Sequence, residues 1–305
     1  MSTDFIANSQ HGVGPVVLPT ANLRFGCWRV ESKRGQGRWH TVYLVQPFGA
    51  NKAPRNDYSL KAVTKGLSDE RHWQAIDRLA RRVMMHELWQ HSGVAPILDA
   101  ELDRFPFFIV EPLIPGQSLL QLAKCLCDWH LSKTLWIARQ IAEVLNGAHH
   151  KSITHLGLKP DKIVVDANGK VTVHGWSNTH RFDQRCWLPK ESVGDVFTRA
   201  PEAFFKDYRA QPAADVFSFG TLMFFLFSGT WPTCGRTVEE VERQQKSLLP
   251  PDLLKVSRVC PEPLASLINR MLSKNPLRRP TIDSVLDQLV SIEIDQIGEQ
   301  QSQRR

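Results

Sequence analysis

The stretch that decides the fold reads "ITHLGLKPDKIVV" and covers residues 153–165. Upstream, residues 132–150 carry apolar side chains at helical spacing, which predicts an amphipathic helix. Downstream, "KIVVDANGKVTVHGW" (162–176) contains two β-rich runs around an Asn-Gly pair, which predicts a hairpin. The quoted stretch therefore connects a predicted helix to a predicted hairpin.

Strand-like and helical patterns separate along the chain. Before residue 110, alternating apolar positions predict strands, and one helix is predicted over residues 68–91. The predicted strands are "CWRVE" (27–31), "HTVYLVQ" (40–46), "DYSLKAV" (57–63), "PILDAEL" (96–102) and "PFFIVEPL" (106–113). Beyond residue 117 the pattern is mainly helical, with an apolar helix over 214–228. These patterns predict an α+β protein with two lobes, a small antiparallel sheet with one main helix and a larger helical lobe.

The composition of the 305-residue chain is typical of a globular protein in the cytoplasm. Hydrophobic residues make up 42% and charged residues 23%. The most apolar segment, residues 216–229, is too short to span a membrane, and the N-terminus has no secretory pattern. Six cysteines lack metal-site spacing, so we expect reduced thiols and no metal site. They are Cys27, Cys125, Cys127, Cys186, Cys234 and Cys260.

The formal charge of +7 is concentrated near the N-terminal end. Residues 24–82 contain thirteen Lys or Arg against five Asp or Glu, and Arg78, Arg81 and Arg82 share one predicted helix. This region is either an anion-facing surface for nucleic acid, phosphopeptide or an acidic partner, or a solvated helix with basic strands.

Seven segments, in this order and spacing, resemble the protein kinase family over residues 25–294. They are "GQGRWHTV" (35–42), "YSLKAV" (58–63), "FIVEPLIPGQSL" (108–119), "HLGLKPDK" (155–162), "RAPEAF" (199–204), "DVFSFG" (215–220) and "NPLRRPT" (275–281). The resemblance implies a bilobal kinase fold with these boundaries: a flexible leader over 1–24, an N-lobe over 25–110, a hinge over 111–116, a C-lobe over 117–294 and a polar tail over 295–305.

The resemblance also implies a nucleotide cleft. Gly35, Gly37 and Val42 would form its glycine-rich loop, and Lys61 would bind phosphate. Glu111 and Leu113 would present backbone groups at the hinge, and Val110 would gate the back pocket. The expected cofactor is ATP without magnesium, because the metal-binding residues of the family are replaced in this sequence.

Four structural roles are also implied. Arg279 is expected to form a buried bidentate pair with Glu202, which suits the fixed geometry of a guanidinium group. Asp215 is expected to accept backbone N–H bonds from the 155–162 loop, and His155 to be packed beneath it as a structural histidine.

The groups that carry out phosphoryl transfer in this family are replaced. Gly157 stands at the position of the catalytic aspartate and Lys162 at that of the metal-binding asparagine. Gly175, in "GWS", replaces the metal-binding aspartate of Asp-Phe-Gly, and Trp176 replaces its phenylalanine. Arg82 stands where the helix of the small lobe normally offers a glutamate to the lysine.

Further departures accompany these replacements. Leu156 replaces the catalytic-loop arginine, and His40 adds bulk in place of the third loop glycine. Lys61 and Lys159 are retained, either as phosphate contacts or as residues that pair with other acids. Trp176 is expected to pack in the core between the lobes, in preference to stacking on a cofactor. Lys162 could itself serve as a cation in place of a metal.

The chain is thus predicted to be a pseudokinase, a kinase fold that binds protein partners as a scaffold, allosteric regulator or nucleotide-sensing module. One alternative is an atypical phosphotransferase with residual ATP-dependent activity, for which Asp161 and Asp166 are the nearest acids. The other is a module that binds nucleic acid or another polyanion through the basic N-lobe.

Overall fold

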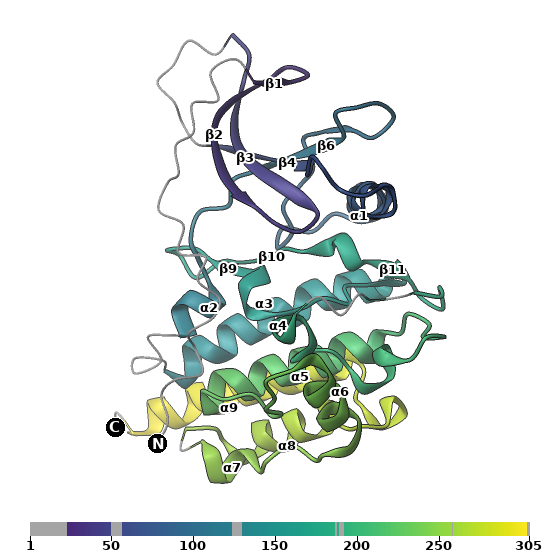
Figure 1. Cartoon of the computed structure of the whole chain (residues 1–305). Coiled ribbons are helices and arrows are strands. Elements are labelled where there is room, and N and C mark those ends of the chain that lie inside the picture. The colour runs from purple at the N-terminus through teal and green to yellow at the C-terminus, as the bar shows by residue number, and fades with distance from the viewer. Residues whose placement is uncertain are drawn as a thin grey trace. The chain divides into compact units, whose positions relative to one another are not determined.

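A computed structural model describes residues 23–49, 57–123, 130–186, 188, 192–257 and 259–303. The chain folds into two compact units (Figure 1). The first unit contains the described residues up to Val83 together with Pro96–Leu113, and the second contains Met84–Ala95 and the described residues from Ile114 onward.

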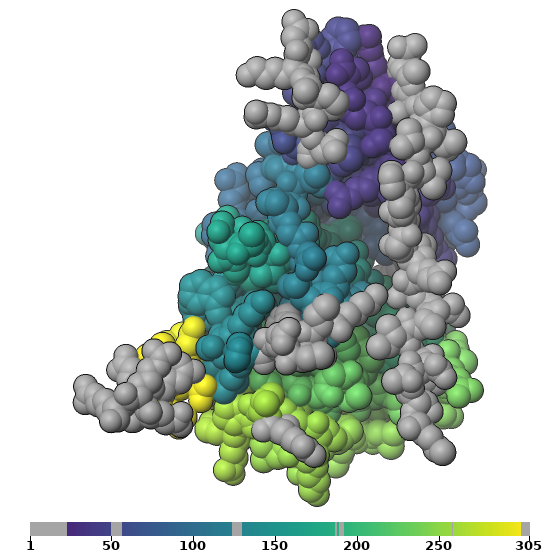
Figure 2. Space-filling model, turned by 90° about the vertical axis from the view of Figure 1, so that its left-hand side faces the viewer, coloured from purple at the N-terminus to yellow at the C-terminus, as the bar shows by residue number. Residues whose placement is uncertain are grey.

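The first unit is a six-stranded antiparallel sheet with one helix, α1 (Asp69–Leu88), which begins in this unit and ends in the second. The strand order is β1-β2-β3-β4-β6-β5 (Figure 1). The strands are β1 (Arg24–Phe25), β2 (Trp28–Gln36), β3 (His40–Pro47), β4 (Tyr58–Val63), β5 (Asp99–Glu101) and β6 (Phe108–Pro112). Figure 2 shows the surface of β2 and β3 as purple atoms.

The two faces of this sheet bury different sets of side chains, because successive residues of a strand point to opposite faces. Val110 packs with Leu60 and Trp28 in one cluster. Its neighbour Ile109 packs with Val63 and the α1 residue Leu79 in a second cluster. The odd-numbered side chains of β4 and β6 therefore point to the face of the sheet that packs against α1.

The second unit is mainly helical. Its helices are α2 (Leu119–Leu122), α3 (Leu131–His150), α4 (Val193–Val196), α5 (Pro212–Ser228), α6 (Val238–Ser247), α7 (Leu253–Val256), α8 (Glu262–Met271) and α9 (Ile282–Gln303). Single 3₁₀ turns are η3 (Pro160–Lys162), η4 (Trp176–Asn178), η5 (Pro201–Phe204) and η6 (Pro276–Arg278). Short strand pairings link β7 (Gln117–Ser118), β9 (Ile163–Val165) and β10 (Val171–Val173), and also β8 (Ile153–Thr154) and β11 (His180–Arg181).

Helix α5 lies at the centre of the second unit's core. It contacts α3, α7 and α8, and most of its side chains are buried. Pro212 occupies the first helical position, where its missing N–H costs nothing. Gly229 ends the helix at φ +71°, a left-handed conformation that glycine adopts without strain. The apolar sequence of α5 thus explains its place in the core, and Pro212 and Gly229 explain where the helix begins and ends.

The predicted α+β class is confirmed: an antiparallel sheet with one main helix forms the first unit, and the larger unit is mainly helical. Two boundaries differ from those expected. Residues 84–95 pack with the second unit, and α9 continues to Gln303, past the expected end at residue 294. The predicted leader falls almost wholly outside the described residues, as do Cys125 and Cys127. None of the helices in the described part of the chain is long and apolar enough to cross a membrane.

Candidate functional site

The 153–162 loop of the second unit is held in shape by the buried carboxylate of Asp215, on α5. Its Oδ2 accepts the backbone N–H of His155 at 2.7 Å, and its Oδ1 accepts that of Leu156 at 2.8 Å. The Nε2–H of His149 donates to the same carboxylate at 3.0 Å. The hydrogen bonds expected between Asp215 and the loop are therefore present.

These bonds support a strained residue. Leu156 has φ +51°, which side chains other than glycine, asparagine and aspartate rarely adopt. Burial by itself raises the pKa of the Asp215 carboxyl, but the hydrogen bond and charge of His149 and the contacts of His155 outweigh it, so the pKa is lowered. An ionised Asp215 thus stabilises a loop conformation that its own sequence disfavours.

His155 is enclosed by the loop and the neighbouring hairpin. Its Nε2 lies 2.8 Å from the carbonyl oxygen of His174, and its Nδ1 accepts the N–H of Gly157 at 3.2 Å. Because Nδ1 accepts an N–H, the ring carries its proton on Nε2 and is neutral, and burial, which lowers the pKa of the imidazole, favours this form. With both ring nitrogens engaged, His155 has the contacts of a structural histidine.

Trp176 is a core residue, as predicted. Its side chain is almost fully buried, its Nε1–H donates to the carbonyl oxygen of Val173 at 2.9 Å, and its ring contacts Trp89 and His155. All of these partners belong to the second unit. The tryptophan therefore fills the space beneath the loop.

Gly157 is the residue expected at the position of the family's catalytic aspartate, and the space beside it is occupied. A Cβ added at Gly157 would lie 3.0 Å from Nδ2 of Asn178, which donates to the carbonyl oxygen of Leu156 at 3.3 Å. Position 157 thus offers no proton acceptor, and Asn178 takes the adjacent room.

Lys162 and Gly175, expected at the two metal-ligand positions of the family, lie against each other. The N–H of His174 donates to the carbonyl oxygen of Lys162 at 2.6 Å, which brings the two segments together. Gly175 has φ +84°, and a Cβ added there would lie 2.8 Å from Cδ of Lys162. The aliphatic part of Lys162 therefore occupies the space that an aspartate side chain at position 175 would need.

Lys159 is paired with carboxylates. Its Nζ lies 2.8 Å from Oδ1 of Asp195, on α4, and 3.4 Å from Oδ2 of Asp161. Burial alone lowers the pKa of the ammonium, but Asp161 and Asp195 outweigh it and raise the pKa. Burial likewise raises the pKa of the Asp195 carboxyl, and Lys159 overcomes this and lowers it. Asp161 also lies 3.4 Å from Nζ of Lys162, so two lysines and two aspartates form a balanced group.

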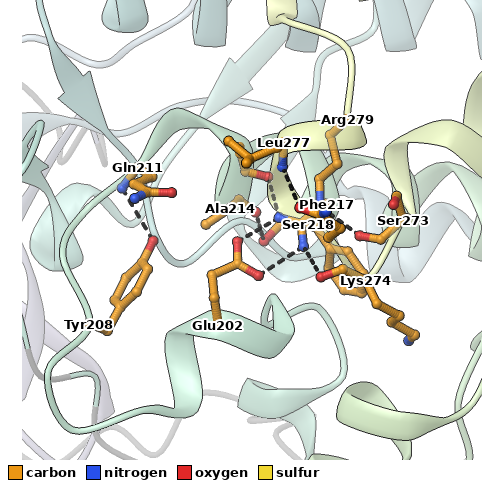
Figure 3. A network of polar contacts seen from close by, with 12 residues as sticks. Glu202, Tyr208, Gln211, Ala214, Phe217, Ser218, Ser273, Lys274, Leu277 and Arg279 are labelled. Atoms are coloured by element: carbon orange, nitrogen blue, oxygen red, sulfur yellow. Dashed lines mark hydrogen bonds and ion pairs between the residues drawn. The ribbon is translucent and has the colours of Figure 1, made fainter.

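The expected Arg279–Glu202 pair is present (Figure 3). The NH1 and NH2 groups of Arg279 donate to the two carboxylate oxygens of Glu202 at 2.5 and 2.8 Å. The same guanidinium donates to the carbonyl oxygens of Ala213 and Ser273, both at 2.8 Å. This pair ties η5 to the segment that precedes α9.

In the first unit, the glycine-rich hairpin is attached to α1. Gly35 and Val42 are paired across β2 and β3, and the N–H of Gly37 donates to the carbonyl oxygen of His40. His40 Nε2 lies 2.9 Å from the carbonyl oxygen of Ala75 on α1. Burial lowers the pKa of His40 to about 4, with smaller contributions from Lys61 and Arg78.

Trp39, at the tip of this hairpin, also contacts the helix. Its indole is buried among α1 and sheet residues that include Ala75 and Leu79. The guanidinium groups of Arg38 and Arg78 lie over its ring, 5.2 and 4.9 Å from the centroid. The hairpin therefore packs on α1 through its tryptophan as well as through His40.

Lys61 is paired with an acid that comes from the sheet. Its Nζ lies 2.6 Å from Oε2 of Glu111, on β6. The other oxygen of Glu111, Oε1, accepts from Nε of Arg82 at 2.9 Å and from its NH2 group at 2.8 Å. The side chains of Glu111 and Arg82 are each 5% exposed, and that of Lys61 is 30% exposed.

These contacts correct three sequence-based expectations. Val110, expected to gate a pocket, points to the face of the sheet opposite α1, while the Glu111 side chain points towards α1. The N–H of Leu113, expected to serve a nucleotide, donates to the carbonyl oxygen of Asp57 at 2.8 Å. Arg82, expected on a basic surface, is buried and paired.

Sequence reasoning missed three side chains that contact residues of the candidate site: those of Glu111, Asp195 and Asn178. Each acts on a residue distant in sequence, so no local pattern identifies it. Within the described ranges, no cluster of three or more His, Cys, Asp or Glu side chains is arranged to hold a metal ion. The magnesium ligands of the family are oxygen donors, and neither Lys162 nor Gly175 has a side-chain oxygen, so these positions do not fit that metal.

The sequence model of the protein kinase domain matches residues 28–290, and the chain belongs to that family. It is similar to calcium-dependent protein kinase 24 of Oryza sativa subsp. japonica, 28% identical over 285 residues that cover 88% of this chain and 52% of that protein. It is also similar to calcium-dependent protein kinase 2 of Arabidopsis thaliana, 29% identical over 265 residues that cover 83% of this chain and 38% of that protein. The chain spans about half or less of the length of these relatives.

Proposed function

We propose that this chain is a pseudokinase, which acts by binding protein partners and does not transfer phosphate. The observation that carries the proposal is the contact between Lys162 and Gly175, at the two positions where protein kinases hold magnesium. Lysine contributes an ammonium and no oxygen ligand, and the lysine chain lies in the space of the missing aspartate. Gly157 removes the proton acceptor as well, so base and metal ligands are lost together.

Nucleotide sensing is part of this proposal, with ATP bound without magnesium. Lys61 would hold the phosphate, and its ammonium is partly exposed although it pairs with Glu111. Lys61, Glu111 and Arg82 together carry one net positive charge, which favours an anionic ligand in the absence of a metal ion. The protein would act in the cytoplasm as a scaffold or an allosteric regulator.

A thermal-shift titration tests the proposal. ATP with EDTA should stabilise the chain by RT ln(1 + [L]/Kd), about 2.7 kcal/mol at one hundred times Kd, and magnesium should not increase this stabilisation. Lys61→Met should reduce the shift, whereas the exposed Lys65→Met should leave it unchanged. Stabilisation that requires magnesium would contradict metal-free binding.

A residual transferase is the second candidate, and the position of one acid favours it. Asp195 lies 2.8 Å from the retained Lys159, so a carboxylate is present beside that lysine. Asp166, by contrast, accepts the N–H groups of Asn168 and Lys170 in the hairpin turn. If magnesium-dependent transfer occurred, Asp195→Asn should abolish it and Asp166→Asn should not.

The third candidate, polyanion binding by the first unit, rests on the two arginines that lie over Trp39. A thermal shift with heparin, but not with ATP, would favour it. That shift should weaken steeply as salt rises, because the bound cations would release counterions.

A further inference from the structure

The acid that pairs with Lys61 comes from strand β6, while helix α1 contributes the cation Arg82. We propose that Glu111 is a positioning residue, which fixes both Lys61 and helix α1 to the sheet through one carboxylate. In the family the helix offers a glutamate to this lysine, whereas here the helix offers an arginine and strand β6 supplies the glutamate.

The register of the sheet places the acid correctly. Strands β4 and β6 are antiparallel, with Lys61 opposite Ile109 and Ser59 opposite Glu111. Lys61 and Glu111 are therefore diagonal neighbours on one face of the sheet, within reach of long side chains. Since Ile109 on the same face packs against α1, Glu111 also faces the helix that carries Arg82.

Helix α1 itself offers no acid for this role. Its acidic residues are Asp69, Glu70, Asp77 and Glu87, and all four are exposed. Asp77 pairs with Arg81 one turn further along the helix. Arg82, by contrast, is buried on the side that faces the sheet. Lys61 thus depends on Glu111 for a buried partner.

The two oxygens of the carboxylate serve different cations, so one residue supports two contacts. Removing the charge of Glu111 would leave the buried Arg82 beside the partly exposed Lys61 with no anion between them, which is unfavourable because Arg82 would lose its buried partner and the two cations would repel each other. Removing Arg82 would leave the Lys61–Glu111 pair intact. The position of α1 on the sheet should therefore depend strongly on Glu111, and it should not depend on a ligand, because all three groups belong to the chain.

Hydrogen–deuterium exchange of the full chain tests this inference. Glu111→Gln should speed exchange of the α1 amides over residues 72–82 by about tenfold or more, with exchange in α3 of the second unit unchanged. Asp77→Asn is the matched control, because it removes an exposed ion pair from the same helix, and it should leave α1 unchanged. Equal exchange in the two variants would overturn the proposal.

Two further variants keep the test decisive if Glu111→Gln does not fold. Arg82→Gln should speed exchange in α1 while β4 stays protected, because Lys61 keeps its partner. Adding Arg82→Glu to Glu111→Gln returns the acid to the helix and should restore folding and protection. If Arg82→Gln leaves α1 unchanged, or if the double variant is no better protected or folded than Glu111→Gln, the proposal fails. The inference does not rest on the absence of phosphate transfer, so a transfer assay can fail or succeed independently of it.

Discussion

Replacing Asp215 with asparagine should destabilise the second unit strongly, because its carboxylate holds the 153–162 loop in shape. The carboxylate is fully buried and accepts hydrogen bonds from His155, Leu156 and His149. An amide with its oxygen in place of Oδ2 keeps the bonds from His155 and His149, turns its NH₂ group towards the N–H of Leu156 and removes the charge. Bonds to a charged group contribute about 1.5–3 kcal/mol each and neutral ones about 0.5–1.5 kcal/mol, so losing one bond and the charge from the other two gives a gross loss of about 3–6 kcal/mol.

Part of that loss is offset when the loop relaxes. Leu156 is held at φ +51°, and a residue in such a conformation stores about 1–3 kcal/mol. The net decrease in unfolding free energy should therefore be about 2–4 kcal/mol. For a unit of this size each kcal/mol lowers Tm by about 2–4 °C, so Tm should fall by about 4–16 °C.

Urea unfolding followed by tryptophan fluorescence measures this change, since Trp176 and Trp89 lie in the same core. Asp283→Asn is the matched control: its exposed carboxylate pairs with His150 at 3.1 Å, and its loss should cost less than about 0.5 kcal/mol. If Asp215→Asn were as stable as Asp283→Asn, the loop would not be held as described.

Two other predictions concern charged and titratable groups. Arg279→Met should lower the free energy of unfolding by about 3–5 kcal/mol in the same urea assay, because it leaves Glu202 without its buried partner. Arg185→Met, which removes an exposed ion pair, should have little effect. His40 has a folded pKa of about 4, below the unfolded value of about 6.5, so the unfolded chain binds more protons between these pH values and stability falls as pH falls. Between pH 7.5 and 5.5 this residue should account for about 1 kcal/mol of lost stability. His40→Gln should remove this pH dependence, whereas His130→Gln, at an exposed histidine, should leave it unchanged.

The sequence predicted the fold class and the supporting contacts of the loop. The resemblance to the kinase family was sufficient for Asp215, Glu202 and Arg279, because each lies in a motif that the family shares. Trp176 was predicted in the core because core packing is the simplest role for a large aromatic side chain, in preference to stacking on a cofactor. In each case the signal lies within a short motif.

The sequence did not predict which side chains face each other in the first unit. Along a strand the side chains alternate, so a shift of one residue moves a side chain to the opposite face of the sheet. Val110 was expected to gate a pocket, but its side chain lies on the face opposite α1, and the neighbouring Glu111 lies on the α1 side. The partner of Lys61 could be identified only from the register between β4 and β6. Asp195 was missed because α4 brings it to Lys159 from 36 positions away.

Transfer of the γ-phosphate tests the central claim most directly. The full chain is incubated with magnesium, γ-labelled ATP and a mixture of serine- and threonine-containing peptides, beside a Lys61→Met variant that reports any contaminating kinase. The account predicts no label on the peptides or on the chain itself above the level of the variant, because base and metal ligands are both replaced. Magnesium-dependent labelling that Lys61→Met abolishes would contradict it.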